Sequence, residues 1–226
     1  MYNLTELTEE QFAMLELMND RLFEYIPADD YRYYIRESIR LGEEAYEEYK
    51  CRDLEQILKE AQVEIIRNER EFEHGLPGYK VWAQVSYGEH EKKIELFMPE
   101  IRKKCSVLTQ NGIKVQEQWL VTMHLAHEFY HFLEYSCRGS AGEKLKPVKK
   151  KKSFRTVEKP LRTASEIAAH SFAVRYMNSD IYPQLTDYLV FLHEGILTQE
   201  AFQKKMEQMM NLLCNSRDGG KDVSVG

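Results

Sequence analysis

The chain has 226 residues, of which 43% are hydrophobic and 30% charged, and this composition excludes wholesale disorder. Its first residues carry acids where a signal peptide carries bases, and no run of about 18 apolar residues occurs, so we expect a cytoplasmic protein with no membrane partner. The formal net charge of −6 disfavours general phosphate binding, so we expect no direct nucleic-acid partner.

Two amphipathic helices are predicted at the start of the chain. Apolar residues recur at helical spacing over 8–25, and Pro27 ends this first helix. Residues 29–50 form the second helix, which has a glutamate-rich, solvated face. We therefore expect an N-terminal helical hairpin over residues 1–52, attached to a larger second domain over residues 53–216.

The next segment predicts a short helix over 53–61, a small β-meander and a further short helix over 99–108. Two β-like runs, at 78–89 and 92–99, are each bounded by turn residues or charges. The strand from Ile94 to Pro99 has two readings: it is an edge that adds an extended peptide to the sheet, or it only buries its apolar face in the core.

The second half of the chain is predicted to be mostly helical. A long helix without proline or glycine spans 115–135, and three more follow it at 161–177, 182–195 and 198–213. Gly, Pro and a lysine run predict a mobile basic loop over 138–160. The fold class is therefore α+β and mainly helical, and the last residues, 217–226, are expected to form a flexible tail.

The long helix contains an H-E-x-x-H motif that indicates a metal site. His127 and His131 are four residues apart, so both imidazoles project from one helix face and can reach one zinc ion at about 2.0–2.1 Å. Glu128 lies beside that face, where its carboxylate can act as general base toward an activated water. Zinc then needs a third protein ligand from further along the chain.

Glu166 is the best third ligand, because small residues around it allow its helix to approach the H-E-x-x-H helix closely. The alternative is that Glu166 forms a capping box with Thr163 at the helix start. His170, one turn after Glu166, is either a ligand itself, a partner that orients the carboxylate, or an ordinary polar residue. His124, one turn before the motif, has the same alternatives.

Two motifs together carry a family resemblance. HLAHEFYHFLEY, at residues 124–135, is followed by E-x-x-A-x-x-F-A, at residues 166–173. This pair resembles the ImmA/IrrE family of zinc metallopeptidases, and the resemblance covers roughly residues 53–178. The chain departs from the family at Tyr130, where relatives often have glycine, and at Asn178, where many have proline.

The resemblance implies a zincin-like fold with one zinc ion per chain, held by His127, His131 and Glu166, with Glu128 as general base. It implies an endopeptidase whose substrate is a specific protein, such as a transcriptional repressor. The alternative function is a non-catalytic regulatory module that binds proteins and keeps only a metallopeptidase-like fold. Sources for stabilising the oxyanion of the reaction are Tyr135, Tyr176 and His193, which the sequence does not rank.

The segment between the two motifs is strongly basic. From Arg138 to Arg162 there are ten Lys/Arg against two acids. Such a run is usually a solvated loop. The alternative is a lid or docking strip for an acidic partner, because the run joins the two helices that carry the metal ligands.

Overall fold

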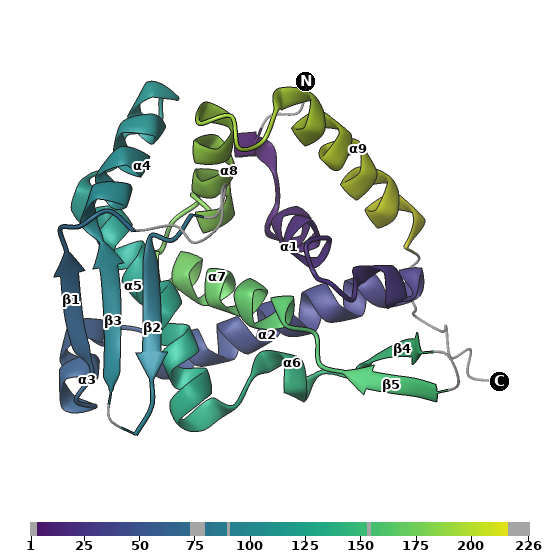
Figure 1. Ribbon diagram of the computed structural model, residues 1–226, viewed down its shortest axis with the longest axis horizontal. Coiled ribbons are helices and arrows are strands. Elements are labelled where there is room, and N and C mark those ends of the chain that lie inside the picture. Colours follow the sequence, from purple (N-terminus) through teal and green to yellow (C-terminus); the bar gives the residue numbers. More distant parts are fainter. Residues whose placement is uncertain (1–3, 73–79, 90, 153–154, 217–226) are drawn as a thin grey trace.

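The computed structural model describes residues 4–72, 80–89, 91–152 and 155–216 (Figure 1). It confirms a mainly helical α+β fold. No helix among the described residues is long and apolar enough to cross a membrane. The α-helices are α1 (Glu9–Leu17), α2 (Tyr31–Tyr49), α3 (Leu54–Glu60), α4 (Met98–Gln110), α5 (Glu117–Leu133), α6 (Ala141–Lys144), α7 (Thr163–Met177), α8 (Pro183–His193) and α9 (Gln199–Asn215).

The main sheet is mixed and has the strand order β1-β3-β2. Strand β3 (Lys92–Phe97) pairs in parallel with β1 (Glu64–Asn68) and antiparallel with β2 (Ala83–Tyr87). The two predicted strands pair antiparallel as expected, and the feature that was not predicted is the parallel strand β1 beside β3. Of the two readings of the strand from Ile94 to Pro99, the structure shows burial in the core, because β3 is the central strand and not an edge. Ile94 and Leu96 share one face of β3 and are fully buried, and neighbours on both edges of such a strand pair its backbone N–H and C=O groups.

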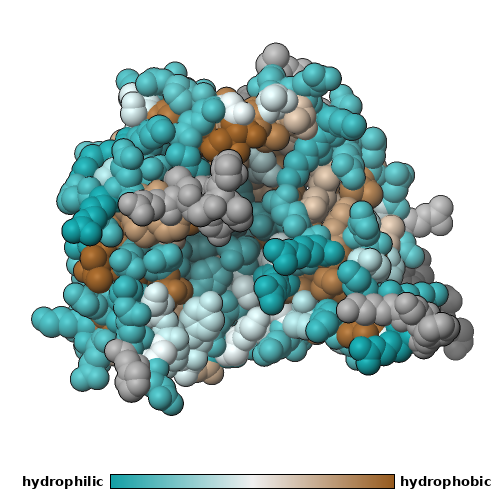
Figure 2. All heavy atoms as spheres, viewed as in Figure 1, coloured by the Kyte–Doolittle hydropathy of each residue, from teal (hydrophilic) through white to brown (hydrophobic). Residues whose placement is uncertain are grey.

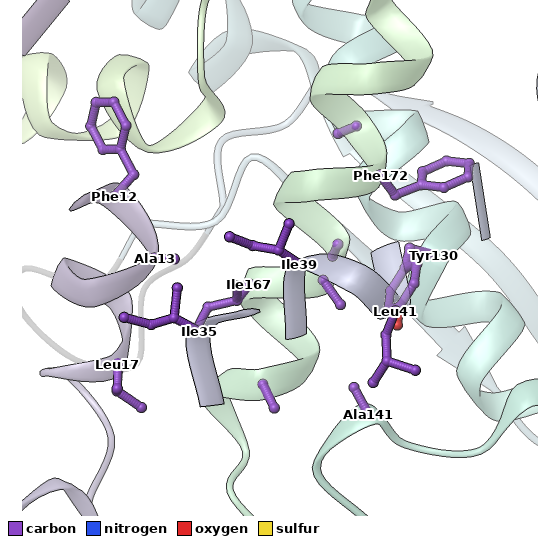
Figure 3. Packing of buried hydrophobic residues seen from close by; sticks show 14 of the residues in the cluster. Phe12, Ala13, Leu17, Ile35, Ile39, Leu41, Tyr130, Ala141, Ile167 and Phe172 are labelled. Atoms are coloured by element: carbon purple, nitrogen blue, oxygen red, sulfur yellow. The ribbon is translucent and has the colours of Figure 1, made fainter. Parts of the chain in front are cut away.

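The N-terminal helices share one core with α7 (Figure 3). Phe12 of α1, Ile35 and Ile39 of α2 and Ile167 of α7 are all buried in this core. Helix α1 ends at Leu17, earlier than the predicted residue 25. It is followed by a turn because the Asp20 side chain accepts hydrogen bonds from the backbone N–H groups of Leu22 and Thr163, and the second of these lies 143 residues away.

Helix α7 lies unusually close to α2 at Gly42. A Cβ atom at this position would lie 2.3 Å from the carbonyl oxygen of Ala168, so only glycine allows this approach. Ala168 and Ala169 of α7 are themselves fully buried. The small residues therefore hold α7, and with it Glu166, at a fixed distance from the rest of the core.

Helix α5 lies between the sheet and α7 (Figure 1). Its apolar residues Leu125, Ala126, Phe129 and Leu133 are buried. The observed bounds of α5 fall within the predicted range of 115–135. Burial of this helix on several sides fixes the direction in which its histidines project.

The segment 138–160 contains ordered elements where a loop was predicted. A π-turn, η4 (Glu134–Arg138), follows α5, and α6 leads to a two-stranded antiparallel ribbon, β4 (Val148–Lys152) and β5 (Arg155–Lys159). The lysine run hid the strands because it shows no alternation of apolar and polar residues. The predicted flexible tail, 217–226, lies outside the described residues.

Candidate metal centre and catalytic cleft

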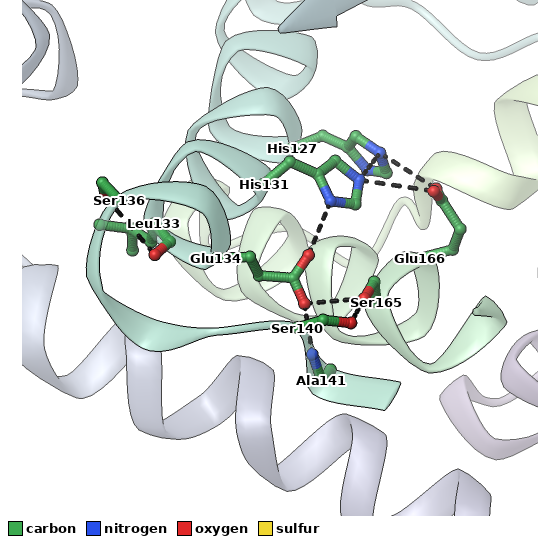
Figure 4. Close-up of polar contacts among 9 residues, drawn as sticks. All are labelled: His127, His131, Leu133, Glu134, Ser136, Ser140, Ala141, Ser165 and Glu166. Carbon is green, nitrogen blue, oxygen red and sulfur yellow. Dashed lines mark hydrogen bonds and ion pairs between the residues drawn. The ribbon is translucent and has the colours of Figure 1, made fainter. Parts of the chain in front are cut away.

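Helices α5 and α7 bring three predicted metal ligands to one point (Figure 4). The Nε2 atoms of His127 and His131 are 3.1 Å apart. Oε2 of Glu166 lies 3.4 Å from Nε2 of His127, and Oε1 lies 3.5 Å from Nε2 of His131. Two imidazoles and one carboxylate thus converge, although 34 residues of chain separate His131 from Glu166.

The alternative role of Glu166 in a capping box is not observed. Helix α7 begins at Thr163, and its N-cap residue, Arg162, makes no capping hydrogen bond through its side chain. The Thr163 hydroxyl instead donates to Asp20, at 3.1 Å. Glu166 is left to face the two histidines.

His131 is oriented by a carboxylate that the sequence did not single out. Nδ1 of His131 lies 3.0 Å from Oε2 of Glu134, which is buried. The other oxygen of Glu134 accepts hydrogen bonds from the backbone N–H of Ala141, at 2.6 Å, and the hydroxyl of Ser165, at 2.7 Å (Figure 4). A carboxylate that accepts from Nδ1–H leaves the Nε2 lone pair of the same imidazole free for a metal ion.

We expect Glu134→Gln to weaken metal binding about 10- to 100-fold, the usual cost of losing such an orienting partner. The glutamine amide would place an N–H₂ group against a donor, because all three partners of Glu134 donate to it. Competition with a chromogenic chelator measures the affinity. Glu143→Gln, an exposed change in the nearby helix α6, is the matched control, and equal affinities of both variants would contradict this role.

The electrostatics of the cluster favour a cation. Burial opposes charge on His131, but hydrogen bonds to Glu134 and Glu166 outweigh it and hold the pKa of His131 well above its ordinary value. Burial would raise the pKa of Glu166, yet His127 and His131 hold it well below the usual range. The Glu166 side chain is 45% exposed, so solvent screens part of this effect. The same two histidines and carboxylate can therefore stabilise either a proton or a metal ion.

Glu128 is placed to act as a base. It is only 8% exposed, and burial raises its pKa above the ordinary value, while His127, His131 and a hydrogen bond from the Val85 backbone act in the opposite direction. A general base works best when its pKa lies near the working pH. Glu128 also borders the same cleft as the metal-ligand cluster.

A cleft of about 680 Å³ opens in front of these residues, and Figure 2 shows a hollow at the centre of this face. Strand β2 and helices α1, α5, α7 and α8 all contribute to its walls. Tyr135 lines the cleft and is 60% exposed, whereas Tyr176 and His193 do not line it. Glu16, which the sequence did not single out, borders it from α1, and burial together with Glu166 raises its pKa to about 7.

His170 adds a fourth donor close to the cluster. His127, Glu166 and His170 each offer a ligand atom within 4.8 Å of the others, so this group can hold a metal ion. Nδ1 of His170 is buried without a hydrogen-bond partner among the described residues, and so is Oε1 of Gln184. Both side chains line a small internal cavity, where the space open to the centre of a water molecule is about 10 Å³, close to the minimum for one water.

His124 belongs to a different cluster. Its Nε2 lies 3.2 Å from Nζ of Lys104, a fully buried side chain that pairs with Asp187 and lies 3.8 Å from the ring centre of Trp82. Burial and the Lys104 charge lower the pKa of His124 well below its ordinary value. His124 therefore forms part of the cleft wall, and its Nε2 faces Lys104 and not the metal-ligand cluster.

The chain was also compared with models of protein families, with curated proteins and with solved structures, and none of these three comparisons gave a match.

Proposed function

We propose that the protein is a zinc-dependent endopeptidase with a zincin-like fold. His127, His131 and Glu166 hold one zinc ion, and Glu128 is the general base. The proposal depends on a site made from a helix that carries both histidines and a second helix that carries the carboxylate. Such a His₂Glu set is one of the usual protein ligand sets of catalytic zinc.

The spacing of the three donors is the observation that carries the proposal. A tetrahedral zinc site with bonds of about 2.0–2.1 Å separates its ligand atoms by about 3.3–3.4 Å. The two Nε2 atoms of His127 and His131 are 3.1 Å apart, and they lie 3.4 and 3.5 Å from Oε2 and Oε1 of Glu166, respectively. Three protein ligands leave the fourth position for water or substrate, as hydrolysis requires.

The roles of the side chains follow from their burial and partners. Bound zinc would polarise the scissile carbonyl and lower the pKa of a water to about 7. The Glu128 carboxylate accepts a proton from the attacking water and passes it to the leaving amine. Its raised pKa suits it for both steps. Tyr135 is the one predicted oxyanion donor that borders the cleft.

The cleft suits an extended peptide. Strand β2 is an edge strand of the described sheet, and its residues Ala83, Gln84 and Val85 line the cleft. An extended chain can pair with such an edge through main-chain hydrogen bonds. This supports a protein substrate, and the family resemblance of the two motifs makes a transcriptional repressor our specific proposal.

A library of quenched-fluorescent peptides tests the proposal. Zinc-loaded wild-type protein should cleave members of the library, lose this activity when a chelator removes zinc, and regain it when zinc is returned. Cleavage that persists through chelation would exclude zinc-dependent hydrolysis.

One observation favours the alternative, a non-catalytic module that binds proteins. With His170 beside His127, His131 and Glu166, the chain offers four donors, and zinc sites closed by four protein ligands are structural. In that case metal binding stabilises the fold and hydrolysis is absent. The ligand variants described in the Discussion distinguish the two functions.

A further inference from the structure

The β4–β5 ribbon is a separate two-stranded sheet that projects from the body of the protein (Figure 1). An isolated two-stranded hairpin is only marginally stable unless something supports it. Val148 is buried at the base of the ribbon, and Nζ of Lys150 lies 4.5 Å from the ring centre of Tyr25. These contacts attach strand β4 to the body, whereas strand β5 is mostly exposed.

The ribbon carries strongly positive charge on both of its faces. Between Val148 and Lys159 the described residues include six Lys/Arg and one acid, Glu158. Four of these basic side chains are exposed: Lys149, Lys151, Arg155 and Lys159.

The fold neutralises little of this charge. Lys149 and Glu158 form an ion pair at 3.9 Å, but their side chains are 71% and 57% exposed, so the pair contributes little stability. No ion pair joins Lys151, Arg155 or Lys159 to another described residue. The positive charge is therefore available to an external partner.

The ribbon is also close in sequence to α7, a helix that lines the cleft. Strand β5 ends at Lys159, and helix α7, which carries the ligand Glu166, begins at Thr163. The start of α7 is held in place, since both the backbone N–H and the hydroxyl of Thr163 donate to Asp20. A segment bound on the ribbon is thus anchored beside the helix that supplies a metal ligand.

We propose that the β4–β5 ribbon docks an acidic segment of the protein substrate and so helps to select it. This inference rests on the proposed endopeptidase function and adds a substrate class to it. A short acidic segment fits better than nucleic acid, because the chain has a net charge of −6 and residues 1–100 contain 24 acids against 12 Lys/Arg. A long polyanion would be repelled by this acidic remainder.

Fluorescence anisotropy with a labelled decaglutamate peptide tests the docking. The ribbon variant combines Lys149→Glu, Lys151→Glu and Arg155→Glu. The matched control changes the same charge at three exposed lysines outside the ribbon: Lys59→Glu, Lys114→Glu and Lys204→Glu. We expect the ribbon variant to bind the peptide at least about tenfold more weakly than wild type, and the control to stay within about twofold.

Three results would overturn the proposal. The first is no binding of the peptide by wild type at low salt. The second is an equal loss of peptide affinity in both variants, which would mean that binding depends only on the net charge of the protein. The third is tighter, ribbon-dependent binding of a labelled single-stranded DNA of 20 nucleotides, which would assign the ribbon to nucleic acid. Because anisotropy needs no hydrolysis, peptide docking by a protein without peptidase activity would refute only the endopeptidase function.

Discussion

Glu128→Gln should lower kcat for peptide hydrolysis by about 10²- to 10⁴-fold, the usual contribution of a general base. The amide keeps the shape of the side chain but cannot take a proton at neutral pH. Glu128 makes none of the three donor contacts of the cluster, so zinc should stay bound in full. Initial rates on a cleaved library peptide, with zinc content measured on the same samples, give both quantities.

Glu117→Gln is the control for this change, because Glu117 starts the same helix and its side chain is 44% exposed. It should leave both the rate and the zinc content unchanged. A Glu128→Gln protein that still cleaves at the wild-type rate would remove the general-base role. A wild type that cleaves nothing while it binds zinc would favour the non-catalytic module.

His131→Ala should weaken zinc binding by more than about 100-fold, whereas His170→Ala should weaken it by no more than about tenfold. The reason is distance and orientation. Nε2 of His131 lies 3.1 and 3.5 Å from its two neighbours and is fixed by Glu134, while the His170 donor is placed only within 4.8 Å of His127 and Glu166. Chelator competition on both variants measures the difference.

Each other outcome has a definite meaning for the ligand set. If His170→Ala loses zinc and His131→Ala keeps it, the ligands are His127, Glu166 and His170. If both variants lose zinc equally, the site has four protein donors and is closed, which favours a structural metal. Gln184→Leu is then a second test of whether His170 is a ligand, because it removes the side-chain acceptor that lines the same cavity as His170.

The sequence predicted the parts of the site that depend on local structure. The spacing of His127 and His131 defines one face of a helix whatever the tertiary fold, and the structure places both side chains on that face. Glu166 was predicted from the small residues that let its helix approach the H-E-x-x-H helix, and α7 does pack against α5. The close approach of α7 to α2 at Gly42 was not predicted. These predictions used periodicities that a single segment carries by itself.

The missed features all depend on contacts between distant segments. Glu134 reaches His131 because a π-turn follows α5, and its other partners, Ala141 and Ser165, belong to different elements. An acid three residues after the second histidine was the available signal. Strand order could not be read locally either, because the parallel pairing of β1 with β3 depends on a chain crossing rather than on composition.

The N-terminal helix shows the same limit. Its predicted length of 8–25 followed apolar spacing alone, yet Asp20 ends it by accepting from Leu22 and Thr163. The same residue then fixes the start of α7. A single polar side chain that accepts hydrogen bonds from two turns leaves no periodic pattern in the sequence. The apolar spacing therefore predicts the helix but not the residue at which it ends.

Zinc bound per chain, measured by mass spectrometry on purified wild type beside His127→Ala, tests the central claim most directly. We expect about one zinc ion per wild-type chain and almost none in His127→Ala. His193→Ala, which changes a histidine outside the cleft, should keep the wild-type content. Wild-type protein that takes up no zinc, or a His127→Ala protein that retains it, would contradict a metal site formed by α5 and α7.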